Sequence, residues 1–140
     1  MAKRAKRKYN NKKVEIDGIL FDSNLEGNVY IALKDMQGRG LISQLKTHPR
    51  WELQPKLTES YIKHLKTKDK VCERTILQPI YYTADFSFIQ DEKLRVIDVK
   101  GSKYVISKDF PLRVKILRFK YGIDVHVVYS LKDLSIYDKD

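Results

Sequence analysis

The sequence predicts an α/β domain in which helices flank a small mixed central β-sheet. Apolar residues recur at helical spacing over 23–37 and 107–121, and the stretches around residue 85 and after residue 123 are rich in residues that favour strands. The chain has 140 residues, of which 42% are hydrophobic, and this is enough for one domain with its own core.

Composition excludes several classes of protein. Cys72 is the only cysteine, so the chain can form neither an intramolecular disulfide nor a zinc site built from cysteines. No apolar run approaches the roughly 18 residues that span a bilayer, and the basic N-terminus is not followed by the apolar segment of a secretory signal. We therefore expect a cytoplasmic protein with no membrane partner.

Much of the positive charge lies at the N-terminus. The net charge is +10, yet outside residues 1–13 there are only 21 basic against 18 acidic side chains. The first thirteen residues contain no acidic side chain and seven basic ones: Lys3, Arg4, Lys6, Arg7, Lys8, Lys12 and Lys13. We interpret this segment as a disordered arm that binds nucleic-acid phosphates through counterion release, with a solubilising tail as the alternative.

The first half of the chain is expected to contain a hairpin and two helices. Residues 14–21 alternate weakly and include the turn dipeptide Asp17-Gly18, which favours a hairpin. The helix predicted at 23–37 has an apolar stripe made of Leu25, Val29, Ala32, Leu33 and Met36. After short extended pieces, a polar, lysine-rich stretch at 58–70 is expected to form a second helix.

The second half is expected to complete the sheet. Residues 80–88 and 94–100 are predicted strands, 107–121 a helix that ends at Gly122, and 123–129 a last strand. The chain then divides into three parts: a basic arm at 1–13, one domain at 14–130 and a polar, frayed tail at 131–140.

The two central strands bring acidic residues together. A hairpin with a loop at 90–93 pairs residues whose numbers sum to 183, so Asp85 lies opposite Asp98, and Lys100 shares their face. Opposed carboxylates are destabilising unless one is protonated or a cation lies between them. Their oxygens suit a hard cation such as Mg²⁺ or Mn²⁺. Such an ion beside a lysine is equipment for hydrolysing a phosphodiester.

The same register gives the hairpin an apolar face. We expect one helix to cover this face, which leaves the acidic face free for a cleft; the apolar residues are Ala84, Phe86, Phe88, Ile97 and Val99. Glu26 lies at the edge of the buried stripe of the first helix, from which a carboxylate can reach the sheet. It can equally complete a capping box with Ser23, and the sequence leaves both roles open.

These residues resemble the PD-(D/E)xK nuclease superfamily. Asp85, a spacer of twelve residues and Asp98-Val99-Lys100 match its motif, with Glu26 as the upstream helical glutamate. Ala84 stands where the motif has proline, and Asp98 replaces the more frequent glutamate. Further segments resemble small phage-encoded nucleases of this superfamily, so that the resemblance runs from about residue 9 to 129.

The resemblance implies a restriction-endonuclease-like core and a Mg²⁺-dependent DNA endonuclease, with Mn²⁺ as a substitute. It is similar to Holliday-junction resolvases, which implies branched DNA such as four-way junctions as substrate during phage DNA recombination in the host cytoplasm. The implied catalytic residues are Glu26, Asp85, Asp98 and Lys100, of which the first three hold the metal. Glu52 and Gln54 could border the site, although ordinary strand positions are favoured for both. A non-catalytic nucleic-acid-binding module that uses the basic arm is the alternative.

The helix at 107–121 has more than one apolar stripe. One consists of Phe110, Val114, Leu117 and Tyr121, and the other of Leu112, Ile116 and Phe119. A surface helix needs one stripe, so the second predicts cover either by another subunit in a homodimer or by residues 56–70. A third side is basic and could hold DNA phosphates, unless it is only a solvated face; its residues, with one from the preceding loop, are Lys108, Lys115, Arg118 and Lys103.

Overall fold

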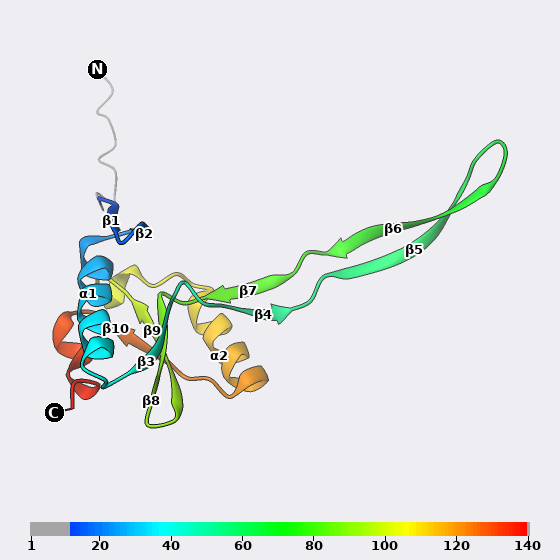
Figure 1. Ribbon diagram of the computed structural model, residues 1–140. Helices are drawn as coiled ribbons and strands as arrows, with labels where there is room; N and C mark the ends of the chain where they lie inside the picture. Colours follow the sequence, from blue (N-terminus) through cyan, green and yellow to red (C-terminus); the bar gives the residue numbers. More distant parts are fainter. Residues whose placement is uncertain (1–11, 140) are drawn as a thin grey trace, which may run out of the picture.

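The computed structural model describes residues 12–139. Two helices flank a four-stranded mixed sheet, and a long two-stranded ribbon projects from one side (Figure 1). The helices and strands follow in this order: β1 (Val14–Ile16), β2 (Ile19–Phe21), α1 (Asn24–Gly38), β3 (Ser43–Thr47), β4 (Arg50–Gln54), β5 (Leu57–His64), β6 (Asp69–Leu77), β7 (Ile80–Thr83), β8 (Phe86–Gln90), β9 (Lys93–Val99), α2 (Phe110–Tyr121) and β10 (Val125–Val128), with short 3-10 helices at Lys103–Val105 and Leu131–Ile136. The α/β class predicted from the sequence is confirmed. No helix in the described part of the chain is long and apolar enough to cross a membrane.

The central sheet has the order β10-β9-β8-β3, in which β10 runs parallel to β9 and the other pairs are antiparallel. The predicted register of β8 and β9 is confirmed, because Phe86 pairs with Ile97 and Ile89 with Leu94. The expected four-residue loop is shorter: Gln90 pairs with Lys93, and Asp91 and Glu92 turn the chain with φ of 53° and 62°. Two positive φ values in succession match the twist of a tight hairpin.

The strand predicted at 80–88 is wrong as one continuous element. The chain bends at Ala84 and Asp85, so that β7 pairs with β4 while β8 joins the central sheet. The two backbone amides at the bend are satisfied separately, since Ala84 N–H donates to the carbonyl of Pro49 and Asp85 N–H to that of Ile97. The bend moves Asp85 out of the regular ladder to the end of the sheet.

Both faces of the central sheet are covered, and the expectation of one open face is wrong. The α1 face buries a cluster that includes Phe21, Val29, Leu33, Phe86, Phe88 and Ile97. The α2 face buries a second cluster that includes Leu53, Tyr82, Ala84, Val96 and Leu117. Ala84 therefore does not share a face with Phe86, because the bend turns it toward α2. A cleft can form only at an end of the sheet.

The helix predicted at 58–70 is also wrong, because these residues lie in β5, in the turn that follows it and at the start of β6. β5 and β6 are antiparallel, and their paired residues include Ile62 with Val71 and Thr58 with Thr75. Such β-branched cross-strand pairs favour a ribbon over a helix. The β5–β6 ribbon, residues 57–77, extends the β4–β7 pair outward after an interruption at Pro55 and Pro79 (Figure 1). It does not cover α2, so this explanation for the second apolar stripe is wrong.

The segment from 131 to 139 is not a frayed tail. Ser130 is the N-cap of its 3-10 helix and forms a capping box with Asp133. Leu134 and Tyr137 are buried in the core cluster under α1. Tyr137 packs edge-on against Phe88 at 5.0 Å between ring centroids, so the globular part of the chain continues past residue 130.

The helix α2 begins later than the sequence predicts. Asp109 is its N-cap and Phe110 its first residue, so Lys108 precedes the helix. Its end is as predicted, because Gly122 adopts the left-handed conformation with φ of 69° and donates its N–H to Arg118. Of its residues only Leu117 is fully buried.

Candidate functional site

A cleft of about 650 Å³ opens where β9 ends and α1 begins. All four residues predicted to be catalytic line it: Glu26 in the first turn of α1, Asp85 at the bend before β8, and Asp98 and Lys100 at the end of β9. Lys12, from the basic segment, also lines this cleft. The five arm residues before it, Lys3, Arg4, Lys6, Arg7 and Lys8, lie outside the described residues.

Glu26 lies both in the first turn of α1 and in the cleft, but it does not close the expected capping box with Ser23. Ser23 caps α1 by accepting the N–H of Glu26 at 3.1 Å. Glu26 Oε2 in turn accepts the N–H of Asp22 at 3.3 Å, one residue before the expected capping-box partner. Its other oxygen, Oε1, lies 2.9 Å from His48 Nε2. The helix cap therefore fixes the orientation of a buried carboxylate at the site.

His48 is a site residue that the sequence did not indicate. It lies between β3 and β4 with φ of 51°, and its backbone N–H donates to the carbonyl of Asp85 at 2.9 Å. One ligand atom from each of Glu26, His48 and Asp85 lies within 4.8 Å of the other two. The position follows from the pairing of β3 with β8, and no motif in the sequence predicts that pairing.

Asp98 and Lys100 form a second group in the same cleft. The buried carboxylate of Asp98 accepts a hydrogen bond from Tyr82 Oη at 2.7 Å, and its Oδ1 lies 3.1 Å from Lys100 Nζ. That nitrogen also lies 4.6 Å from the ring centroid of Phe110. Burial, together with the charge of Asp98, raises the pKa of Tyr82 far above its ordinary value. Tyr82 therefore stays protonated and keeps donating to Asp98.

The electrostatics of the cleft are dominated by crowded carboxylates. Burial is the main cause that raises the pKa of Asp85 from 3.8 to about 8, and the charges of Glu26 and Asp98 add to it. The N–H of Val99, 2.6 Å from Asp85 Oδ2, and the charge of Lys100 oppose the shift without cancelling it. The charge of Lys100 does not offset the crowded carboxylates, and a bound divalent cation would add the positive charge that stabilises their ionised forms. The oxygen-rich donor set fits a hard ion such as Mg²⁺ or Mn²⁺.

Within residues 12–139, the other basic residues predicted to bind DNA do not line the cleft. Lys103, Lys108 and Lys115 are exposed, as is Arg118, which forms an ion pair with Asp124 at 2.5 Å. Lys13 is exposed as well. Glu52 and Gln54 lie on β4, and neither lines the cleft.

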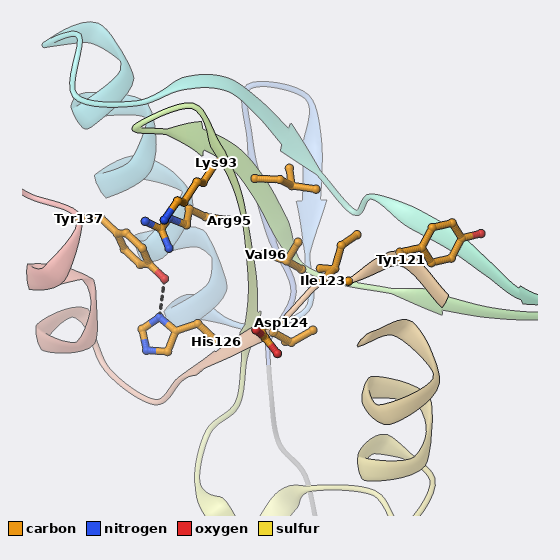
Figure 2. Close-up of a pocket in the computed structure, with 11 residues that line it drawn as sticks. Lys93, Arg95, Val96, Tyr121, Ile123, Asp124, His126 and Tyr137 are labelled. Carbon is orange, nitrogen blue, oxygen red and sulfur yellow. Dashed lines mark hydrogen bonds between the residues drawn. The ribbon is translucent and has the colours of Figure 1, made fainter. Parts of the chain in front are cut away.

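A larger hollow, of about 840 Å³, lies at the opposite end of β9 (Figure 2). Of the described residues that line it, Asp124 is the only carboxylate, and Lys93, Arg95 and His126 are basic. His126 Nδ1 lies 2.7 Å from Tyr137 Oη, the contact drawn in Figure 2. The chemistry of the donor groups, rather than the volume, therefore places the candidate site in the smaller cleft.

The fold and the cleft define the class: an α/β domain with buried carboxylates converging at the end of its central sheet. The chain belongs to the DUF1064 family, described as a protein of unknown function, whose model matches residues 6–138. No curated protein and no solved structure matches the chain.

Proposed function

We propose that this protein is a metal-dependent DNA endonuclease of the PD-(D/E)xK type with a restriction-endonuclease-like core. It uses Mg²⁺, or Mn²⁺ in its place, and acts in the cytoplasm on branched DNA such as Holliday junctions during phage recombination. The observation that carries the proposal is the convergence of Glu26, Asp85 and Asp98 beside Lys100 in one cleft. The pKa of about 8 for Asp85 supports it, because burial and the nearby charges of Glu26 and Asp98 disfavour the ionised carboxylate, and a bound cation would stabilise it.

Glu26 and Asp85, with Asp98 beside them, would hold the metal. A bound divalent ion acidifies a water molecule and neutralises the charge that develops on the phosphate. The imidazole of His48 suits Mn²⁺ better than Mg²⁺ as a ligand, and it can alternatively orient Glu26 from outside the coordination sphere. Either role requires the geometry that the bend at Asp85 creates.

Lys100 and Tyr82 position the remaining carboxylate. Tyr82 holds one oxygen of Asp98 and Lys100 approaches the other, so the carboxylate has little rotational freedom. The ammonium group of Lys100 is partly exposed in the cleft, where it can orient the attacking water or stabilise the pentavalent phosphate.

The experiment that tests the proposal is a cleavage assay with Mg²⁺ on a four-way junction and on a linear duplex of the same sequence. Asp98→Asn retains an acceptor for Tyr82 but removes the charge, and we expect it to abolish cleavage while DNA binding without metal persists. Asp124→Asn is the matched control, since this exposed carboxylate lies in the other hollow. We expect it to leave cleavage unchanged.

The outcomes separate the readings. Paired symmetric nicks in the junction, absent in Asp98→Asn, would support a resolvase. Equal cleavage of both DNAs would keep the endonuclease and remove the junction preference. Binding without cleavage in either Mg²⁺ or Mn²⁺ would overturn the enzyme and leave a nucleic-acid-binding module.

A further inference from the structure

The β5–β6 ribbon has no cover within the described chain. Its two strands pair only with each other, and every residue from 57 to 77 is exposed except Glu59 and Cys72, which are half-buried. A two-stranded ribbon is at best marginally stable alone in water, and three or more strands or a packed helix are usually needed. A partner that covers the ribbon would stabilise it.

The tip of the ribbon is strongly basic. Among residues 63–70 the only acidic side chain, Asp69, lies 2.8 Å from His64. The basic ones, none of which has an acidic partner within ion-pair distance in residues 12–139, are Lys63, Lys66, Lys68 and Lys70. Lys63 lies directly opposite Lys70 in the register, and like charges in that position repel each other. A polyanion would relieve this repulsion.

One face of the ribbon combines these cations with an aromatic ring. The pairs Lys63–Lys70 and Tyr61–Cys72 are two positions apart, so they share a face. The guanidinium of Arg74 lies 5.4 Å from the ring centroid of Tyr61 on the same side, where it also forms an ion pair with Glu59. Cations next to an aromatic ring are groups that contact phosphates and sugars.

The β4–β7 pair joins the ribbon to the candidate site. β4 begins two residues after His48, and β7 ends two residues before Asp85. From residue 50 to residue 64 an extended chain spans at most roughly 50 Å. This corresponds to the rise of about 15 base pairs of duplex. The tip can therefore reach phosphates well outside the cleft.

We propose that the β5–β6 ribbon is a DNA-binding arm that grips the duplex flanking the cleavage site. Its tip lysines contact phosphates, and the two-stranded ribbon has the dimensions to enter a major groove. This inference rests on the proposed function for the identity of the substrate. The exposed apolar pair of Ile62 and Val71, at 59% and 73%, would suit a second copy of the chain instead. The opposed lysines at the tip favour DNA.

The test is the salt dependence of DNA affinity, measured on the full chain without metal. The double variant Lys63→Gln/Lys70→Gln is compared with Lys132→Gln/Lys139→Gln, which removes the same charge from the C-terminal segment, far from the ribbon (Figure 1). A plot of log affinity against log salt has a negative slope, and we expect its magnitude to be smaller by about 1 to 2 in the ribbon variant. The slope of the control should match that of the wild type. An unchanged slope in the ribbon variant would overturn the proposal.

A second measurement uses Cys72, the only cysteine, as a probe of the ribbon. We expect a duplex to slow its alkylation by a maleimide. Protection that instead grows with protein concentration in the absence of DNA would overturn the proposal in favour of self-association. Because no metal is present, the outcome is independent of cleavage. If the chain cleaves DNA but Cys72 is not protected, the proposed nuclease activity stands and the DNA-binding ribbon is overturned. If the chain never cleaves DNA but shows both the smaller salt dependence and the protection of Cys72, the DNA-binding ribbon stands.

Discussion

At the scale of single residues, Asp85 links the site to stability. In the metal-free protein its pKa is about 8, against an ordinary 3.8, so between these pH values the folded state binds a proton that the unfolded state has lost. The stabilisation is complete below about pH 4 and is lost as the pH rises through 8. Asp85→Asn keeps an acceptor for Val99 without the charge. We expect it to exceed the wild type in unfolding free energy by roughly 1 kcal/mol or more at pH 8.

Urea unfolding in EDTA at a series of pH values measures this difference, which should shrink toward pH 4. Addition of Mg²⁺ at pH 8 should stabilise the wild type and leave the variant nearly unchanged, because the ion needs the carboxylate. A stability difference that stays constant with pH would contradict a raised pKa at Asp85.

Residue roles were predictable where they depended on local spacing. Asp98 and Lys100 are two residues apart on one strand, so their shared side followed from alternation alone, and the structure places both in the cleft. The position of Glu26 at the edge of the buried stripe was visible in the sequence, whereas its hydrogen bonds to Asp22 and His48 were not. His48 could not be found, because only the pairing of β3 with β8 brings it to Asp85.

At the scale of elements, Leu117 is the only fully buried residue of α2, and it packs with Tyr82 and Val96. Phe110, Val114 and Ile116 pack against the same cluster and are partly buried. Leu117→Ala should cost roughly 2–5 kcal/mol of unfolding free energy through lost burial and a residual cavity. The same change at Leu20, which is 54% exposed, should cost less than about 1 kcal/mol.

Thermal unfolding of the two variants side by side checks this expectation. Equal losses of stability in Leu117→Ala and Leu20→Ala would show that the packing of α2 does not depend on the buried side chain of Leu117. If the proposed nuclease activity holds, Leu117→Ala should also weaken cleavage, since Phe110 on the same helix lies against Lys100.

Elements differ in how far their sequences predicted them. The β8–β9 hairpin was predictable with its register because a one-residue slip would have split its apolar face. The β5–β6 ribbon was not, since its lysines suggested a solvated helix while its β-branched residues, paired across strands, decided the structure. The bend at Ala84 was not predictable either, because it depends on β7 and β8 pairing in different sheets, which local sequence does not specify.

At the scale of the whole molecule, α2 retains an uncovered apolar surface. Leu112 is 60% exposed and Phe119 is 93% exposed, and the ribbon that could have covered them projects elsewhere (Figure 1). We propose a homodimer that buries this stripe. Light scattering should then give twice the chain mass of 16.5 kDa, and Phe119→Glu should return the mass to that of one chain. A single-chain mass for the wild type at micromolar concentration would contradict the dimer.

The overall class was predictable from the order of helical and extended segments, but the location of the cleft was not. The sequence suggested an open sheet face, whereas α1 and α2 cover both faces and the site lies at the end of β9. Which side of a sheet a helix packs on depends on contacts between residues far apart in the chain, such as Leu117 with Val96. Local patterns do not contain that information.

The pairing of Gln54 with Ile80 has a topological consequence. These two residues are neighbours across the ladder although the chain between them runs out along the whole ribbon and back. A two-residue turn could therefore join β4 to β7 directly. Residues 55–79 are in this sense an insertion into a β4–β7 hairpin that is complete without them. The length of this insertion can change without altering the path of any other part of the chain, so the reach of the proposed arm can change while the cleft residues keep their positions.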